Sequence, residues 1–189
     1  MSNRITIDTS ALNRVMRGMR GFESEVPAAV LSALNRTIDH VFTKSAQEVT
    51  KRYNIKNKEV KETMYKQRAS LGRINAFVRF RGKRFTLGRF LPGGLNSTSK
   101  VAKVKIKKSA GYQRVGGEPK AFVQKVTGRA QVMRREGRRR YPVDVMRTIA
   151  TAQMVENEDV QASIQTAAAT MLSRRMEHEI ERRLRRTIR

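Results

Sequence analysis

The chain has two histidines, and it contains no cysteine. His40 follows Asp39, but adjacent residues on a helix point in different directions, so a local pair between them is weak. His178 lies in the sequence Met-Glu-His-Glu-Ile, and the position four residues later is Arg182 rather than the second histidine of a helical metal site. We interpret both histidines as structural and predict neither a catalytic triad nor a metal site.

Nucleotide and nuclease chemistry is also poorly supported by the motifs. No glycine-rich segment has the Gly-Lys-Ser/Thr ending of a phosphate loop, and no GxGxxG opens a helix after a strand. A two-metal nuclease needs convergent carboxylates, whereas those of the middle hundred residues are scattered. We therefore expect no enzyme activity and no cofactor. The scattered carboxylates are Glu59, Glu62, Glu118, Glu136 and Asp144.

The remaining side chains with a clear chemistry are cations, which bind phosphate oxygens through charge-assisted hydrogen bonds. Four lysines interleave with apolar residues, and five arginines flank an expected tight turn at Glu136 and Gly137. We predict that these two groups bind nucleic acid through its backbone. They are Lys103, Lys105, Lys107 and Lys108, and Arg134, Arg135, Arg138, Arg139 and Arg140.

The charge of the whole chain is confined to one region. Lys and Arg number 41 against 16 Asp and Glu, a formal net charge of +25. Residues 1–50 and 151–189 each have a net charge of +1, so residues 51–150, with 28 basic and 5 acidic side chains, have +23. A concentration of this kind favours a phosphate-binding surface, although a solvated flexible segment is the simpler alternative.

The overall composition narrows the class of protein further. The 189 residues suit one domain, and the absence of cysteine excludes a disulfide framework and fits a reducing compartment. No apolar run reaches the roughly 20 residues of a membrane span, and the first ten residues lack the apolar stretch of a signal peptide. We expect a soluble protein that makes no membrane contact.

Helical periodicity marks both ends of the chain. Residues 4–8 alternate like a short strand, and apolar residues at helical spacing follow over residues 12–21. The most regular helical pattern extends from Pro27 to Val49. Asn57 is expected to cap a shorter helix that reaches about Gln67. A last apolar stripe extends over residues 160–188.

The middle of the chain favours strands. Residues 73–80 and 84–90 are rich in β-forming residues, and a glycine-rich turn then leads to a flexible basic hairpin near residues 101–108. Shorter strands are expected at residues 121–125 and 130–134, with Gly128 in a hairpin turn between them.

These elements predict an α+β fold, in which an antiparallel, strand-rich basic middle is covered by the long N-terminal and C-terminal helices. We expect a single domain of residues 1–189, with parts at 1–55, 56–150 and 151–189. The C-terminal stripe offers more apolar surface than a short sheet needs, so part of it is expected to contact a neighbouring subunit. Packing entirely within one chain is the alternative.

Several short motifs resemble the phage minor tail protein Z family, tail-completion proteins of long-tailed phages. Their order along the chain is more specific than any one of them, and the likeness covers roughly residues 28–147 and, weakly, the C-terminal helix. Residues 71–118 match the family mainly in their basic, strand-like character. The motifs are Ala33-Leu34-Asn35-Arg36, Lys56-Asn57-Lys58-Glu59-Val60-Lys61, Ala121-Phe122-Val123-Gln124, Gly128-Arg129, Val132-Met133, Arg135 and Arg139-Arg140-Tyr141-Pro142-Val143-Asp144-Val145.

The resemblance implies a structural protein of the virion, at the head-proximal end of the tail, in the neck, where rings of subunits surround the DNA. It implies no enzyme. The implied partners are further copies of the chain, other neck and tail proteins, and viral double-stranded DNA. The six-fold symmetry usual for tails makes a hexamer the first expectation, and synthesis is expected in the cytoplasm of the bacterial host.

Two other functions remain open from the sequence. The charge alone fits a free-standing, sequence-independent nucleic-acid-binding protein equally well, but only 6% of the residues are aromatic and there is no tryptophan for base stacking. Alternatively, the basic region binds an acidic protein such as a tail-tube or tape-measure partner.

Overall fold

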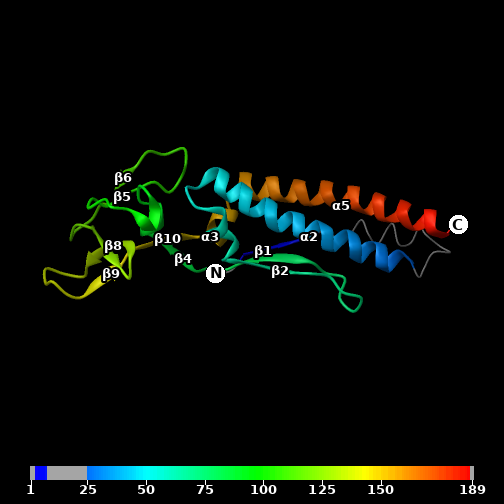
Figure 1. The fold of residues 1–189 in the computed structure, drawn as a ribbon, viewed down its shortest axis with the longest axis horizontal. Helices are drawn as coiled ribbons and strands as arrows, with labels where there is room; N and C mark the ends of the chain where they lie inside the picture. The colour runs from blue at the N-terminus through cyan, green and yellow to red at the C-terminus, as the bar shows by residue number, and fades with distance from the viewer. Residues whose placement is uncertain (1–2, 8–24, 188–189) are drawn as a thin grey trace.

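The computed structural model describes residues 3–7 and 25–187 (Figure 1). The helix predicted over residues 12–21 lies outside these residues. Two long helices, α2 (Glu25–Arg52) and α5 (Glu158–Thr187), lie side by side and point in opposite directions. Both confirm the helices predicted from apolar spacing, because a stripe of that period lies along one face of a helix.

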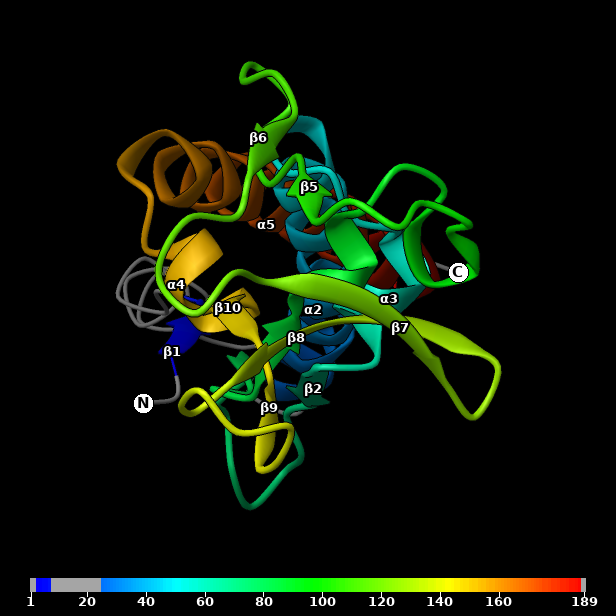
Figure 2. The ribbon, with the colours of Figure 1, turned by 90° about the vertical axis from the view of Figure 1, so that its left-hand side faces the viewer.

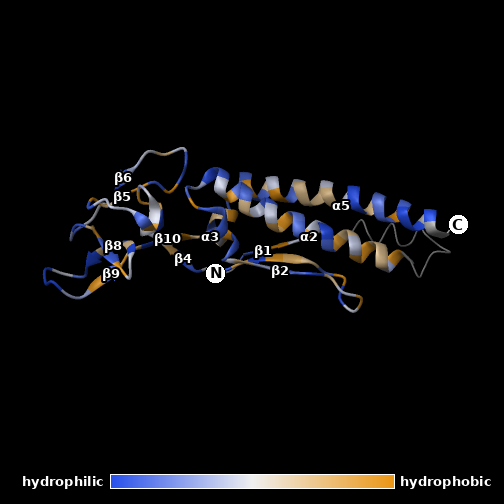
Figure 3. Ribbon diagram, in the orientation of Figure 1, coloured by the Kyte–Doolittle hydropathy of each residue, from blue (hydrophilic) through white to orange (hydrophobic). Residues whose placement is uncertain are grey.

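The apolar stripe of α5 packs within the chain against α2. Its buried members belong to the same hydrophobic cluster as Val30, Leu34 and Ile38 of α2. In the described residues the stripe therefore packs within one chain, which was the alternative to a contact with a neighbouring subunit. Such a contact is not needed to bury it. Figure 3 shows the change along α5 from an apolar middle to a hydrophilic end. The buried residues of the stripe are Val160, Ile164, Ala168, Leu172 and Met176.

Ion pairs tie the two helices together at both ends. Arg52 at the end of α2 pairs with Asp159 at the start of α5. Toward the other end, the fully buried carboxylate of Glu179 lies 3.6 Å from Arg36 Nε and 2.5 Å from a guanidinium nitrogen of Arg182. A buried carboxylate needs such partners, because burying an unpaired charge is costly. These pairs fix how α5 is aligned along α2.

A three-stranded antiparallel sheet with the order β1-β3-β2 lies along α2. Its strands are β1 (Asn3–Thr6), β2 (Met64–Gln67) and β3 (Phe77–Phe80). Val78 and Phe80 are completely buried on its inner face. The strand predicted over residues 4–8 is thus confirmed in its described part.

The short helix α3 (Asn57–Lys61) ends six residues earlier than predicted. Residues 64–67 form β2 instead, because every one of them pairs with β3. The pairing partner is distant in sequence, so the tertiary contact overrides the local helical pattern. Lys56, rather than Asn57, occupies the cap position.

The rest of the middle region forms three small sheets at one end of the helix pair (Figures 1 and 2). The strand predicted over residues 84–90 is only partly correct, since the 3₁₀ helix η1 (Leu87–Phe90) follows β4 (Arg84–Thr86) directly. A second 3₁₀ helix, η2 (Gly94–Asn96), and the short helix α4 (Thr151–Val155) complete this part. The paired strands are β4 with β10 (Arg147–Ala150), β5 (Lys103–Val104) with β6 (Gln113–Arg114), and β7 (Phe122–Val126) with β8 (Arg129–Arg135) and β9 (Val143–Val145).

The β7–β8 hairpin forms as predicted. Thr127 and Gly128 both have positive φ, at 48° and 76°, which is the pair of left-handed residues that a two-residue hairpin turn requires. The tight turn expected at Glu136 and Gly137 is wrong, because β8 and β9 are joined by the longer connection of residues 136–142. The α+β class is confirmed, and every sheet pairing in the described residues is antiparallel.

Carboxylates with cationic partners are concentrated on the helix pair. Burial of Glu179 raises the pKa of its carboxyl, but Arg182, Ser32 and Arg36 together outweigh burial and hold that pKa below its usual value. The pKa of Glu48 is lowered too, chiefly by its hydrogen bond from Lys44. For Asp39, burial is the largest single influence, and Lys66 with Arg68 outweighs it, so this pKa is also lowered. All three carboxylates therefore stabilise the fold when ionised.

We expect the free energy of unfolding to fall as the pH is lowered. Burial, Lys44 and Arg175 lower the pKa of His40, so below about pH 6.5 the unfolded chain binds a proton that the folded protein resists. A steeper loss should follow below about pH 4.5, where the unfolded carboxylates take up protons before Asp39, Glu48 and Glu179 do. Urea unfolding at pH 7, 5.5, 4 and 3 would measure both steps. Equal stability at pH 7 and pH 3 would contradict the prediction.

Candidate nucleic-acid interface

The predicted lysines lie on the β5–β6 hairpin and the segment that follows β5. Lys103 is exposed on β5, where it pairs with Arg114, and Lys105 is half-buried. Lys107 and Lys108 are exposed, while their backbone is held against the end of α2. Lys108 N–H donates to the Arg52 carbonyl over 2.8 Å, and Lys107 forms a bridge with Tyr53. The base of this hairpin is therefore anchored to the helix pair.

Four of the five predicted arginines are displayed to solvent. Arg138, Arg139 and Arg140 are exposed in the connection of residues 136–142, and Arg135 is exposed at the end of β8. The Arg135 guanidinium lies 5.3 Å from the ring centre of Phe122, which limits where this side chain can move. The four guanidinium groups can all meet a phosphate without leaving a buried position.

Arg134 has a different environment. It is half-buried, and its guanidinium donates a hydrogen bond to the Gly116 carbonyl. Gly117 has φ +102°, and a Cβ at that position would lie 2.7 Å from an Arg134 nitrogen. Arg134 thus holds the segment before β7 against β8, which is a supporting contact.

The lysine and arginine groups do not merge into one patch. Both lie at the end of the molecule beyond the helix pair (Figure 1). In the end-on view of Figure 2, however, the β5–β6 hairpin lies at the top, and the β8–β9 connection lies in the lower part of the view.

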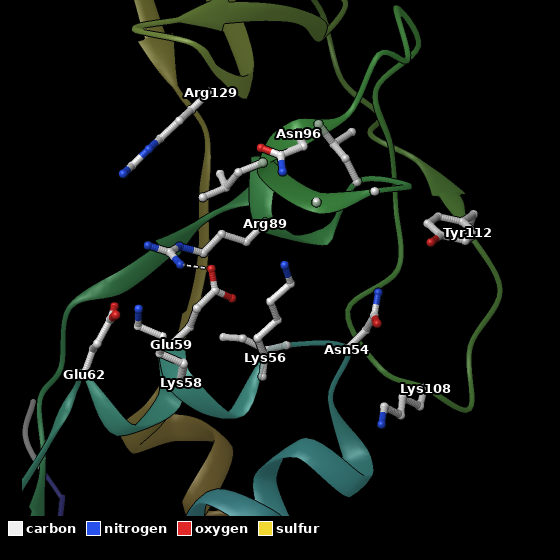
Figure 4. A pocket seen from close by; sticks show the side chains of 15 residues that line it. Asn54, Lys56, Lys58, Glu59, Glu62, Arg89, Asn96, Lys108, Tyr112 and Arg129 are labelled. Atoms are coloured by element: carbon white, nitrogen blue, oxygen red, sulfur yellow. Dashed lines mark hydrogen bonds and ion pairs between the residues drawn. The ribbon is translucent and has the colours of Figure 1, made fainter.

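A groove of about 760 Å³ that the sequence did not predict opens between α3, η2 and the segment that leads to β6 (Figure 4). Its polar lining includes Asn54, Asn96 and Tyr112, and its cations come from four separate segments. The only sequence signal was the basic run around Lys56, because a local pattern cannot show which distant side chains converge. The groove cations are Lys56, Lys58, Arg89, Lys108 and Arg129.

Most of the groove cations are free to meet an anion. Arg89 pairs with Glu59, as the dashed line in Figure 4 shows, and it also lies 5.6 Å from the ring centre of Phe85. Within the described part of the chain, the side chains of the other four cations form no ion pair, and Glu62 is the second carboxylate of the lining. The groove thus keeps an excess of positive charge after its internal pair is counted.

Residues 3–7 and 25–187 contain neither a candidate metal site nor a candidate membrane span. No group of three or more His, Asp or Glu side chains there could hold a metal ion. Among the same residues, no helix has both the length and the apolar character needed to cross a membrane.

An extended helix pair, with exposed cations on the hairpins and connections beyond it, offers surface for contact with other macromolecules. The chain belongs to the family of prophage minor tail protein Z (GPZ), whose family model matches residues 10–189. It is therefore a structural protein of a phage tail, located in the virion. The resemblance seen in the sequence is confirmed, and the match extends through the C-terminal helix. No curated protein and no solved structure matches the chain.

Proposed function

We propose that this minor tail protein completes the tail at its head-proximal end. It forms a ring in the neck that helps to join tail to head, and it contacts the passing DNA without reading sequence. It works without catalysis, as a single domain of residues 1–189 with other neck and tail proteins as neighbours. A ring of six copies fits the symmetry of a tail.

The observation that carries the DNA contact is the separation of charge in the fold. Residues 51–150 have a net charge of +23, and many exposed cations of that region lie on hairpins and connections beyond the helix pair, while others, such as Lys51 on α2 and Arg79 on β3, lie along it. DNA that passes through a ring presents phosphates in every direction, so a basic surface that ignores base identity suits it. The neutral helix pair is left to contact proteins.

We expect double-stranded DNA of any sequence to bind with a steep dependence on salt. If about six phosphates are neutralised per binding unit, log affinity falls with log salt at a slope near −5. Replacing Arg138, Arg139 and Arg140 by Gln should reduce the steepness by about 3, because about one counterion is released per contact. Fluorescence anisotropy with a labelled duplex at several salt concentrations measures both slopes.

The connection of residues 136–142, with its three exposed arginines, is called the arginine connection below. A matched control replaces three exposed cations outside it by Gln, namely Arg73, Lys83 and Arg174. This variant has the same net charge as the first, and it should keep the wild-type slope within one unit. Affinity that barely changes between low and high salt would reject an electrostatic DNA surface. Equal slopes for the two variants would place the contact elsewhere on the protein.

The ring is tested separately by the mass of the purified protein. Native mass spectrometry and light scattering at micromolar concentration should show a closed oligomer, with six copies as the expected number. A protein that stays monomeric, alone and with purified tails, would overturn the ring.

A further inference from the structure

The described residues contain one acidic turn, which joins α4 to α5. Glu156 and Glu158 are exposed there, and neither side chain forms an ion pair in the described part of the chain. Asp159 follows and stays 75% exposed although it pairs with Arg52. In a protein with 41 cations, this turn presents two carboxylates, those of Glu156 and Glu158, that no cation of the described residues pairs with.

Most of the basic groove lies away from the acidic turn, although Lys108 lines both the groove and a second pocket of about 440 Å³ that Asp159 also lines. In Figure 2 the α4–α5 connection is at the left edge, and α3 with the 3₁₀ segments that line the groove is at the right. A contact between such surfaces of two copies is head-to-tail. Contacts of this kind make a ring whenever the rotation between neighbours closes.

We propose that the basic groove receives the acidic α4–α5 turn of the next copy of this chain. Glu156 and Glu158 of one copy then meet Lys56, Lys58, Lys108 and Arg129 of its neighbour. This inference rests on the ring of the proposed function and names the surfaces that build it.

The lining of the groove suits a polypeptide turn better than a DNA backbone. Glu59 and Glu62 in the groove would repel a continuous row of phosphates. The amides of Asn54 and Asn96 can bond to backbone groups, and Leu91, Leu95 and Tyr112 offer apolar contact. A turn carries a few carboxylates among neutral groups, and that mixture matches this lining.

The interface also leaves the exposed arginines available. Arg138, Arg139 and Arg140 are in the connection of residues 136–142, and none of them lines the groove. One copy can therefore hold its neighbour through the groove and contact DNA through the arginine connection. Assembly through the groove would weaken as salt rises, because exposed charge pairs are screened.

The test reverses the charge on each side separately. The first variant carries Glu156→Lys and Glu158→Lys, and the second carries Lys56→Glu and Lys58→Glu. Each should be folded by circular dichroism and should dissociate at least about tenfold more readily than the wild-type oligomer, because like charges then face each other. Glu156→Lys alone, outside both helices, serves where the double change weakens the start of α5.

An equal mixture of the two variants provides the decisive measurement. Each reversed turn then faces a reversed groove, so native mass spectrometry should find restored oligomers that contain both variants in equal number. Matched controls are Glu177→Lys on α5 and Lys83→Glu beside β4, both exposed and outside these surfaces, and they should assemble like the wild type.

The possible results separate the two proposals. A monomeric wild type overturns the ring and this interface together. A wild-type oligomer whose mass is unchanged by both reversed variants overturns the interface alone, as does a mixture of folded, dissociated variants that fails to reassemble. If the lysine variant loses DNA binding while its oligomer stays intact, the groove belongs to DNA and the inference is wrong.

Discussion

Removal of residues 175–189 is expected to unfold the outer half of the helix pair. This part of α5 lies beside the first half of α2, as the Arg36–Glu179 pair shows. Truncation removes Met176 and Glu179, both buried, and leaves Arg36 without its carboxylate. Apolar residues of α2 such as Val30 then lose cover on the side of α5.

The expected loss in the free energy of unfolding is on the order of 5 kcal/mol, chiefly from uncovered apolar surface, with a smaller part from the lost pair between Arg36 and Glu179. That is a large share of the stability of an ordinary domain. Circular dichroism should show more helix lost than the removed residues account for, and amide exchange should speed up in the first half of α2. Urea unfolding gives the free energy.

Glu179→Gln and Glu177→Gln separate the ion pair from the loss of chain. Glu179 is fully buried, whereas Glu177, two residues earlier on α5, points to a different face of the helix and is exposed. Only the Glu179 change should therefore lower stability. The opposite result for the truncation is a folded, soluble chain of unchanged stability that no longer assembles. That result would make the end of α5 an assembly arm and not part of the subunit core.

Gly88→Ala is expected to detach the basic β7-β8-β9 sheet from the rest of the protein. A Cβ on Gly88 would lie 2.2 Å from the Ala130 carbonyl oxygen and 3.2 Å from its carbonyl carbon. These are backbone atoms of β8, so η1 and β8 must move apart to admit the methyl group. Inserting a methyl into a packed contact of this kind costs about 1–3 kcal/mol, and a backbone clash tends to the upper end.

The change should lower the melting temperature and speed amide exchange over residues 122–145, and it should weaken DNA binding because the arginine connection belongs to this sheet. Thermal unfolding and exchange mass spectrometry measure the first two effects. Gly72→Ala is the matched control, since a Cβ there has no atom within 4 Å. If both variants melt like the wild type, η1 does not hold this sheet.

Local patterns in the sequence were sufficient for the elements that depend on near neighbours in the chain. The spacing of apolar residues predicted α2 and α5, because a helix repeats every 3.6 residues whatever it later packs against. Gly128 predicted the β7–β8 turn, since its positive φ is a property of the turn itself. The segregation of charge and the order of the family motifs are also properties of the chain alone.

Features that depend on distant partners were missed or misread. Residues 64–67 read as the end of a helix until β3 pairs with them, and residues 87–90 read as strand although they form η1. The glycine at position 88 is visible in the sequence, but the Ala130 backbone that excludes a side chain there is not.

The apolar stripe of α5 shows the same division. The sequence by itself determined that residues 160–188 would form a helix with one apolar face, but an apolar face is satisfied by any apolar partner. Only the tertiary structure decided that α2 of the same chain covers it. The groove was decided in the same way, because Lys56, Arg89, Lys108 and Arg129 meet only when four segments of the chain pack together, and no local spacing encodes that approach.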